Sequence, residues 1–199
     1  LLAGGNGGGG MVTPSADRPR WAGETAALAV VASDIHAQRA AAYPGLVTAG
    51  KLASDKAANG LRIAAAIAID WRRRAGFAPL DTGSQPATRA ERITTLEQAL
   101  ARPRHQLAKV RATISPGSLA LAAYYADLPE TDRAHFLLDL VEQGLAADPA
   151  IKPWAYACEY LELVEALLWW EQQAHDFDDL AALNAQLHAR AATKPVLAA

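Results

Sequence analysis

Apolar residues recur along this chain at steps of three and four, which is the spacing of one face of an α-helix. The first such run covers residues 24–42, where Leu28, Val31 and Ile35 share a face. We expect it to end before Pro44, because a proline disfavours the helical conformation of the residue that precedes it. This run predicts a first helix.

A second helix is predicted over residues 54–75. Ile63, Ile67 and Trp71 step by four along one face, and the segment begins with a serine that can cap it. Gly76 follows at the position where helices often end on a glycine. The two predicted helices are close enough in sequence to form a hairpin.

A proline- and glycine-containing segment over residues 77–87 is typical of a linker or long loop. Thr88 and Glu91 then have the spacing of a capping box, in which each side chain bonds the other residue's backbone N–H. We expect a third helix from there to Pro103, and a kinked or separate segment over residues 106–112.

The rest of the chain shows the same helical spacing of apolar residues and the same kinds of helix-end signals. Further helices are predicted over residues 115–126, from 129 to about 144–148, over 154–173, and beyond a break at 175–179. No run of β-branched residues alternates with polar ones. The pattern therefore predicts an all-α bundle of about six to seven helices.

These elements suggest four parts. We interpret residues 1–20 as a tag and disordered lead-in, 21–76 as a basic helical hairpin, 77–87 as a linker or loop, and 88–199 as a helical bundle. Cys158 is the only cysteine, so no disulfide is expected, which favours a reducing, cytoplasmic location. The uncharged apolar runs are too short for a membrane span, and we expect no membrane partner.

Charge is divided unevenly along the chain. Residues 1–111 hold 15 basic and 8 acidic residues, a net charge of +7, whereas residues 112–199 hold 4 and 13, a net charge of −9. These values sum to the overall −2. Such a division indicates either a basic surface for an acidic partner or two halves that attract each other, within or between chains.

Part of the predicted hairpin resembles a known group of sequences. The shared features, over residues 39–71, are Arg39 before Tyr43-Pro44, the turn Gly50-Lys51-Leu52, and Ile63 followed by Ala66-Ile67 and Asp70-Trp71. They resemble short helical-hairpin proteins of unknown function from bacterial prophages and mobile elements. The resemblance implies a phage-related context and no particular activity.

Nucleic-acid contacts would need cations gathered on one surface. The candidates in the basic half are Lys51, Lys56, Arg62, Arg72, Arg73, Arg74, Arg89, Arg92 and Arg104. Solvated surface arginines are the alternative explanation. A helix-turn-helix around Arg102-Pro103-Arg104 is less favoured, because the turn lacks the usual glycine.

The acidic half offers a candidate protein interface at Trp169, Trp170, Glu162 and Glu165, although both tryptophans could instead be buried between helices. The evenly spaced Glu159, Glu162 and Glu165 favour a solvated helix face over a metal site, and no metal or cofactor is expected.

We therefore predict a non-enzymatic helical binding protein that engages DNA or RNA through its basic half. In this hypothesis the acidic, aromatic helices of the other half mediate self-association into a homo-oligomer. The alternative is a protein-protein adaptor or inhibitor that uses those acidic, aromatic helices to engage a partner. An enzyme with a carboxylate-bound metal is a third class.

Overall fold

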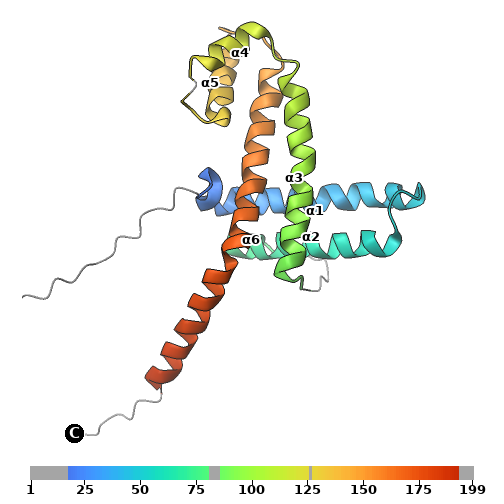
Figure 1. Ribbon diagram of the computed structural model, residues 1–199, viewed down its shortest axis with the longest axis vertical. Coiled ribbons are helices and arrows are strands. Elements are labelled where there is room, and N and C mark those ends of the chain that lie inside the picture. Colours follow the sequence, from blue (N-terminus) through green and yellow to red (C-terminus); the bar gives the residue numbers. More distant parts are fainter. Residues whose placement is uncertain (1–17, 81–85, 126, 193–199) are drawn as a thin grey trace, which may run out of the picture.

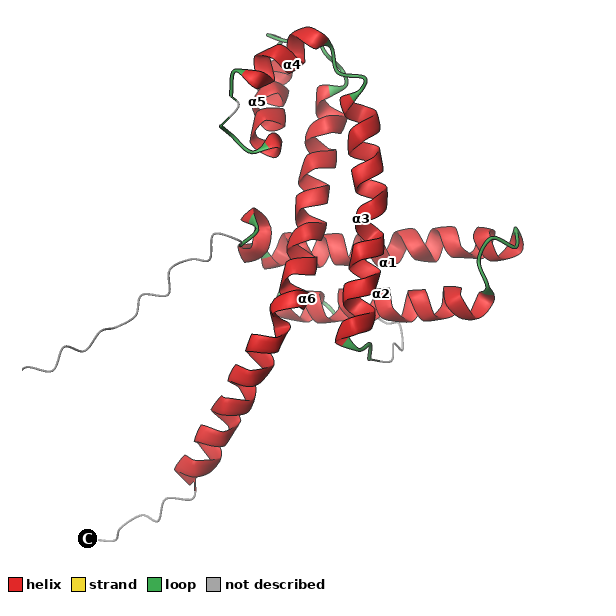
Figure 2. Cartoon of the chain, viewed as in Figure 1, coloured by secondary structure: helices red, strands yellow, loops and turns green. Residues whose placement is uncertain are grey.

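The structure is a computed structural model that describes residues 18–80, 86–125 and 127–192, with side chains described as far as residue 173. Most of the expected tag and lead-in, and part of the expected linker, lie outside these ranges. The elements are η1 (Arg20–Gly23), α1 (Thr25–Thr48), α2 (Ser54–Arg74), α3 (Arg89–Arg111), α4 (Pro116–Ala123), α5 (Glu130–Glu142) and α6 (Ile151–Ala192). The described residues form helices and loops and contain no strand, which confirms the all-α class (Figure 2).

The helices form two pairs that cross (Figure 1). α1 and α2 lie side by side as a hairpin, and α3 and α6 lie across it. α4 and α5 pack at one end of the α3–α6 pair, whereas α6 continues past the hairpin at the other end. Each helix of the crossing pairs thus has a face against the other pair.

The crossing point contains the larger hydrophobic core. Leu28 of α1, Ile67 of α2, Leu96 of α3 and Leu167 of α6 are fully buried there. Burial of each such side chain contributes about 1.5–3 kcal/mol. The hairpin therefore shares its core with α3 and α6.

A second core lies where α4 and α5 pack against the start of α6. Leu137 of α5 and Ile151 and Trp154 of α6 are buried in it. α6 contributes to both cores, which fixes the α4–α5 end relative to the crossing.

Several predicted helix boundaries are confirmed. The capping box is present, with the Thr88 N–H donating to Glu91 Oε2 at 2.8 Å and the Glu91 N–H donating to Thr88 Oγ1 at 3.3 Å. Ser115 caps α4 by accepting from the Ser118 N–H at 3.2 Å. Gly76 follows α2 with a positive φ of 71°.

The expected end of the first helix at Pro44 is wrong, because α1 continues through this proline to Thr48. A proline inside a helix costs one backbone hydrogen bond, but Pro44 lies only one turn from the helix end and is exposed. The helix ends instead at Thr48, and Gly50, whose φ is 66°, follows its C-cap Ala49. There the N–H of Lys51 donates to the carbonyl of Leu46 at 2.9 Å. This bond belongs to a Schellman motif, which satisfies the last carbonyls of the helix.

Pro103 likewise does not end the third helix. α3 runs through it as one helix that ends at Arg111, so residues 106–111 of the expected kinked or separate segment belong to the same helix. Pro103 is buried at the side of the helix. Tertiary packing along α6 therefore outweighs the lost hydrogen bond, and no helix-turn-helix exists around Arg102 and Arg104.

The expected break over residues 175–179 is also wrong, because α6 is continuous from Ile151 to Ala192. That segment contains neither glycine nor proline, and the helix propensities of His and Asp are only modestly unfavourable. At its other end α6 accommodates Pro153, since a proline in the first turn removes no helical hydrogen bond.

No helix in the described ranges is long and apolar enough to cross a membrane.

Candidate functional sites

Basic residues of the first half of the chain form ion pairs with acidic residues of the second half. Ion pairs that join a basic residue of positions 1–111 to an acidic residue of positions 112–199 are Arg20–Asp132, Arg92–Glu171, Arg104–Glu165 and Arg111–Glu130. Three of these arginines lie on α3, and their partners lie on α5 and α6. Attraction between the two halves is one of the two interpretations that the charge pattern of the sequence allows. These ion pairs show that such attraction occurs within this chain.

Arg92 is the most buried of these cations. Its guanidinium lies between Asp70 of α2 and Glu171 of α6, and it donates to Glu171 Oε1 at 3.0 Å. Burial raises the pKa of Glu171, and the charge of Arg92 opposes that rise. This triad joins three helices at the crossing, so Arg92 has a structural role there.

Three other cations of the proposed nucleic-acid set also have partners within the chain. Arg62 pairs with Glu91 and donates to the Pro86 carbonyl at 2.7 Å. Arg89 donates to backbone carbonyls of α6, including that of Glu171 at 2.7 Å. Arg104 pairs with Glu165 at 3.3 Å.

The remaining five basic residues fall at opposite ends of α2. Lys51 and Lys56 are exposed at the hairpin turn, and Arg72, Arg73 and Arg74 form the last turn of the helix. Lys56 and Arg72 are separated by 16 helical positions, or about 24 Å along the axis. The structure therefore does not bring the nine residues together on one surface.

The last turn of α2 carries an aromatic ring as well as cations. After Gly76, the N–H of Phe77 donates to the carbonyl of Arg72 at 2.9 Å, which makes this end a second Schellman motif. The motif folds Phe77 back onto Arg72, whose guanidinium carbon lies 5.7 Å from the ring centroid. Phe77 remains 36% exposed. We call Arg72, Arg73, Arg74 and Phe77 the α2 C-terminal surface.

Cations exceed carboxylates around this surface. Arg73 pairs with Asp70 at 3.1 Å, but Asp70 also serves Arg92, and Arg74 lies 4.9 Å from the centroid of Trp71. The charged side chains that we count here, all among those that the structure describes, are Arg72, Arg73, Arg74, Arg89 and Arg92 with Asp70 and Glu171. Among these described side chains, five positive and two negative charges leave an excess of three positive charges.

Residues of the candidate partner interface make contacts within this chain. Trp170 packs edge-on against Trp71 at 6.2 Å and donates from Nε1 to the Ala22 carbonyl at 2.8 Å. Trp169 is partly buried beside it. Glu162 accepts from Trp21 Nε1 at 2.7 Å and from Thr131. Together with the Arg104–Glu165 pair, these contacts place Trp170, Glu162 and Glu165 at contacts between elements of this chain, whereas Trp169 contacts its neighbour Trp170 on the same helix.

The evenly spaced glutamates of α6 diverge toward different partners. Glu159 lies 3.5 Å from His135 on α5, whereas Glu162 and Glu165 have the partners given above. No group of three metal-ligating side chains is present among the residues whose side chains the structure describes. Cys158 is buried, and burial, reinforced by the charges of Glu130 and Glu162, raises its pKa to about 12. Its thiol is therefore protonated and a poor nucleophile near neutral pH.

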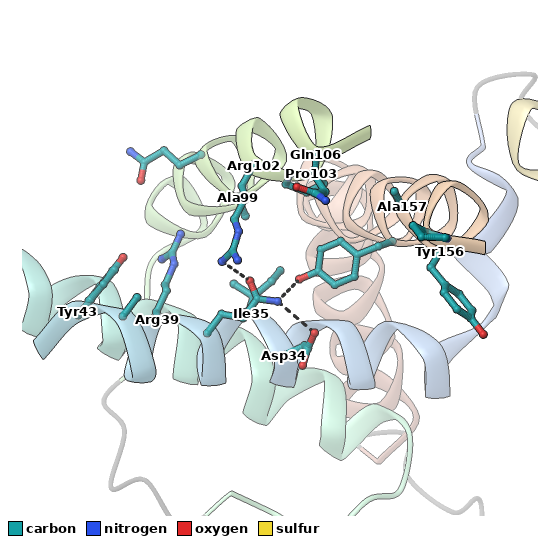
Figure 3. A pocket seen from close by; sticks show the side chains of 15 residues that line it. Asp34, Ile35, Arg39, Tyr43, Ala99, Arg102, Pro103, Gln106, Tyr156 and Ala157 are labelled. Atoms are coloured by element: carbon teal, nitrogen blue, oxygen red, sulfur yellow. Dashed lines mark hydrogen bonds between the residues drawn. The ribbon is translucent and has the colours of Figure 1, made fainter. Parts of the chain in front are cut away.

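A pocket of about 490 Å³ lies between α1, α3 and the first turns of α6. Arg39 and Tyr43 lie on α1 at one end, Tyr156 lies on α6 at the other, and Arg102 points from α3 toward α1 between them (Figure 3). We call it the crossing pocket. Its size is within the usual range of small-molecule sites.

Gln38 links the three helices across the crossing pocket. Its amide oxygen accepts from Arg102 Nη1 at 3.0 Å, and its amide nitrogen donates to Asp34 Oδ2 at 3.2 Å and Tyr160 Oη at 3.3 Å (Figure 3). Burial and the charge of Asp34 raise the pKa of Tyr160, whereas Gln38 and Arg102 oppose the rise. The phenol is therefore protonated at neutral pH.

The guanidinium of Arg39 is fixed in place by two backbone carbonyls. It donates to the Gly60 carbonyl at 3.3 Å and to the Thr95 carbonyl at 3.1 Å, which ties α1 to α2 and α3. Tyr43 packs so closely on Gly60 that a Cβ at that position would lie 3.0 Å from the tyrosine ring. The glycine therefore permits the approach of the helices that shapes this end of the pocket.

Sequence reasoning did not find the crossing pocket, because its lining comes from three helices far apart in the chain. It did not assign Phe77 to a site either. The signal for Phe77 was present, since an apolar residue directly after a helix-ending glycine often packs back on the last turn.

No family model, curated protein or solved structure matches this chain.

Proposed function

We propose that this protein is a nucleic-acid-binding protein that contacts single-stranded DNA or RNA through the α2 C-terminal surface. The observation that carries the proposal is the exposed ring of Phe77 beside Arg72, Arg73 and Arg74. Single-strand binders combine a basic surface for the phosphates with aromatic faces on which unpaired bases stack. The excess of three positive charges among the described side chains around this surface supports the first requirement.

The arginines have different capacities for a phosphate partner. Arg73 is the most available, because its side chain is 77% exposed and its pair with Asp70 is a surface pair of low energy. Arg74 is exposed beside Trp71, and Arg72 is anchored by a 2.8 Å bond from Nε to the Ala78 carbonyl. Arg72 thus positions Phe77, whereas Arg73 and Arg74 face the partner.

The test is a polarisation titration of labelled single-stranded oligonucleotides of about 16 nucleotides, at about 50 and 200 mM salt. Replacing Arg73 and Arg74 together with alanine should weaken binding and lower its salt dependence by about one contact for each arginine. The matched control is the Lys51→Ala/Lys56→Ala variant, which removes the same charge from the other end of α2 and should bind almost normally.

Phe77→Ala separates base stacking from charge. We expect it to weaken single-strand binding by about fivefold or more, because each stacked base contributes about 1–3 kcal/mol. Its binding to heparin, a polyanion without bases, should not change. Absence of binding at low salt, or equal losses in the arginine variant and the lysine control, would refute the proposal.

A further inference from the structure

The crossing pocket has a chemistry distinct from that of the α2 C-terminal surface, and it lies on other elements. It combines cations, amides and phenol rings around a hollow of about 490 Å³. Such convergence of polar groups in a concave site is typical of ligand binding. We propose that the crossing pocket binds a small anion of the nucleoside monophosphate class, which joins a flat base to a phosphate.

The charge of the lining favours an anion. Arg39 and Arg102 contribute two positive charges, and Asp34 contributes one negative charge. Asp34 is turned to Gln38, from which it accepts a hydrogen bond at 3.2 Å. The pocket therefore has an excess of one positive charge.

Arg102 is suited to hold the phosphate. It is exposed, points from α3 toward α1, and donates to Gln38 Oε1 from Nη1 (Figure 3). A guanidinium has five N–H donors, and two of them can engage a phosphate in parallel while another keeps its bond to the amide. Arg39 adds a second positive charge, fixed in place by the Gly60 and Thr95 carbonyls.

The remaining lining suits a flat heteroaromatic ring. Tyr43, Tyr156 and Tyr160 supply phenol rings, on which a base can stack. Gln98 and Gln106 of α3 also line the pocket, and a glutamine amide can pair with the edge of an adenine because it both donates and accepts. A ligand with a base and a phosphate would use both the amide–phenol lining and the cations.

The polar side chains of the pocket are preorganised for ligand binding. Gln38 is held by hydrogen bonds with Arg102, Tyr160 and Asp34, and Arg39 is held by two backbone carbonyls. Side chains already fixed lose little conformational entropy on binding. This argument does not depend on the proposed nucleic-acid function, because no residue is shared between the two sites.

The experiment is calorimetric titration of the full chain with three probes: adenosine monophosphate, adenosine and ribose 5-phosphate. The monophosphate should bind at least about tenfold more tightly than either fragment, because only it engages both the arginines and the rings. No binding of the monophosphate at millimolar concentration would overturn the proposal. Equal binding of ribose 5-phosphate would also overturn it, since the ring would then contribute nothing.

Variants locate the binding in the pocket. Arg102→Met should weaken monophosphate binding by about tenfold or more, because it removes a charge-assisted contact while keeping the aliphatic stem. Ala99→Leu should also weaken it by filling the hollow, and the Arg73→Ala/Arg74→Ala variant should bind normally. Unchanged affinity in both pocket variants, with circular dichroism showing that they fold, would place any binding elsewhere and reject the inference.

Discussion

Arg92 donates from Nη1 to Glu171 Oε1 at 3.0 Å, and this ion pair joins the two oppositely charged halves of the chain at the crossing of its helices. The side chains are only 11% and 7% exposed. A second carboxylate, that of Asp70, pairs with the other terminal nitrogen of the guanidinium, Nη2. The pair therefore lies where its charges are poorly solvated and where three helices meet.

Removal of Arg92 should destabilise the fold strongly. Arg92→Met leaves the buried carboxylate of Glu171 without its counter-ion, and breaking one side of a buried pair costs about 3–5 kcal/mol. Glu171→Gln should cost about 1 kcal/mol, because the amide oxygen can still accept from Arg92, which keeps Asp70 as a charged partner. The free energy of unfolding from urea titrations at neutral pH measures both effects.

The exposed pair Arg104–Glu165 provides the control for this prediction, since these side chains are 60% and 43% exposed. Arg104→Met should change the free energy of unfolding by less than about 1 kcal/mol, because exposed ion pairs contribute little. A similar effect of the two arginine substitutions would show that burial does not set the energy of the Arg92 pair.

Local signals predicted the helix ends well where a side chain satisfies a backbone group nearby. Thr88 and Glu91, Ser115, and Gly76 act within a turn of their own positions, so their spacing is enough to identify them. The prediction that the third helix ends at Pro103 was wrong because it also relied on a local signal alone. The local preference of Pro103 is to end a helix, and only the packing of α3 along α6 shows why it does not.

The candidate sites depended on contacts that local signals do not encode. Arg89, Arg92 and Arg104 belong to the basic half in sequence, but α3 lies against the acidic α6, and their charges are used there. The crossing pocket follows from the same arrangement, since Gln38 and Arg102 meet only when α1 crosses α3. Periodicity identifies the helix faces and does not indicate which faces meet.

Asp148 should make the stability of the α4–α5 end depend on acid. Burial alone would raise its pKa, but the N–H groups of Ser115 and Ala150, at 2.8 and 3.0 Å from its carboxylate oxygens, outweigh burial and lower it. A carboxyl whose pKa is lower in the folded protein stabilises the fold above its unfolded pKa. This contribution is lost as the pH falls through the folded pKa.

We therefore expect Asp148→Asn to reduce the free energy of unfolding by about 1 kcal/mol at neutral pH, since the amide accepts more weakly than the carboxylate. The difference from the wild type should shrink as the pH falls below the ordinary aspartate pKa of about 3.9 and through the lower pKa of the folded protein. Urea titrations across this range measure it. The hydrogen bonds between Thr88 and Glu91 lower the pKa of Glu91 in both proteins, so part of the acid dependence should remain. A constant difference at every pH would contradict the assignment to Asp148.

Gly76 links the stability of α2 to the proposed nucleic-acid surface. Its φ of 71° lies in the left-handed region, where an alanine costs about 1–2 kcal/mol. Gly45 is the matched control, because it lies within α1 and a Cβ there would meet nothing within 4 Å. Gly76→Ala should lower the thermal midpoint and Gly45→Ala should raise it, since alanine is favoured over glycine inside a helix. Gly76→Ala should also weaken single-strand binding, because the strained turn no longer holds Phe77 on Arg72. A destabilised Gly76→Ala protein that binds normally below its melting temperature would show that the Schellman motif does not position the aromatic ring for binding.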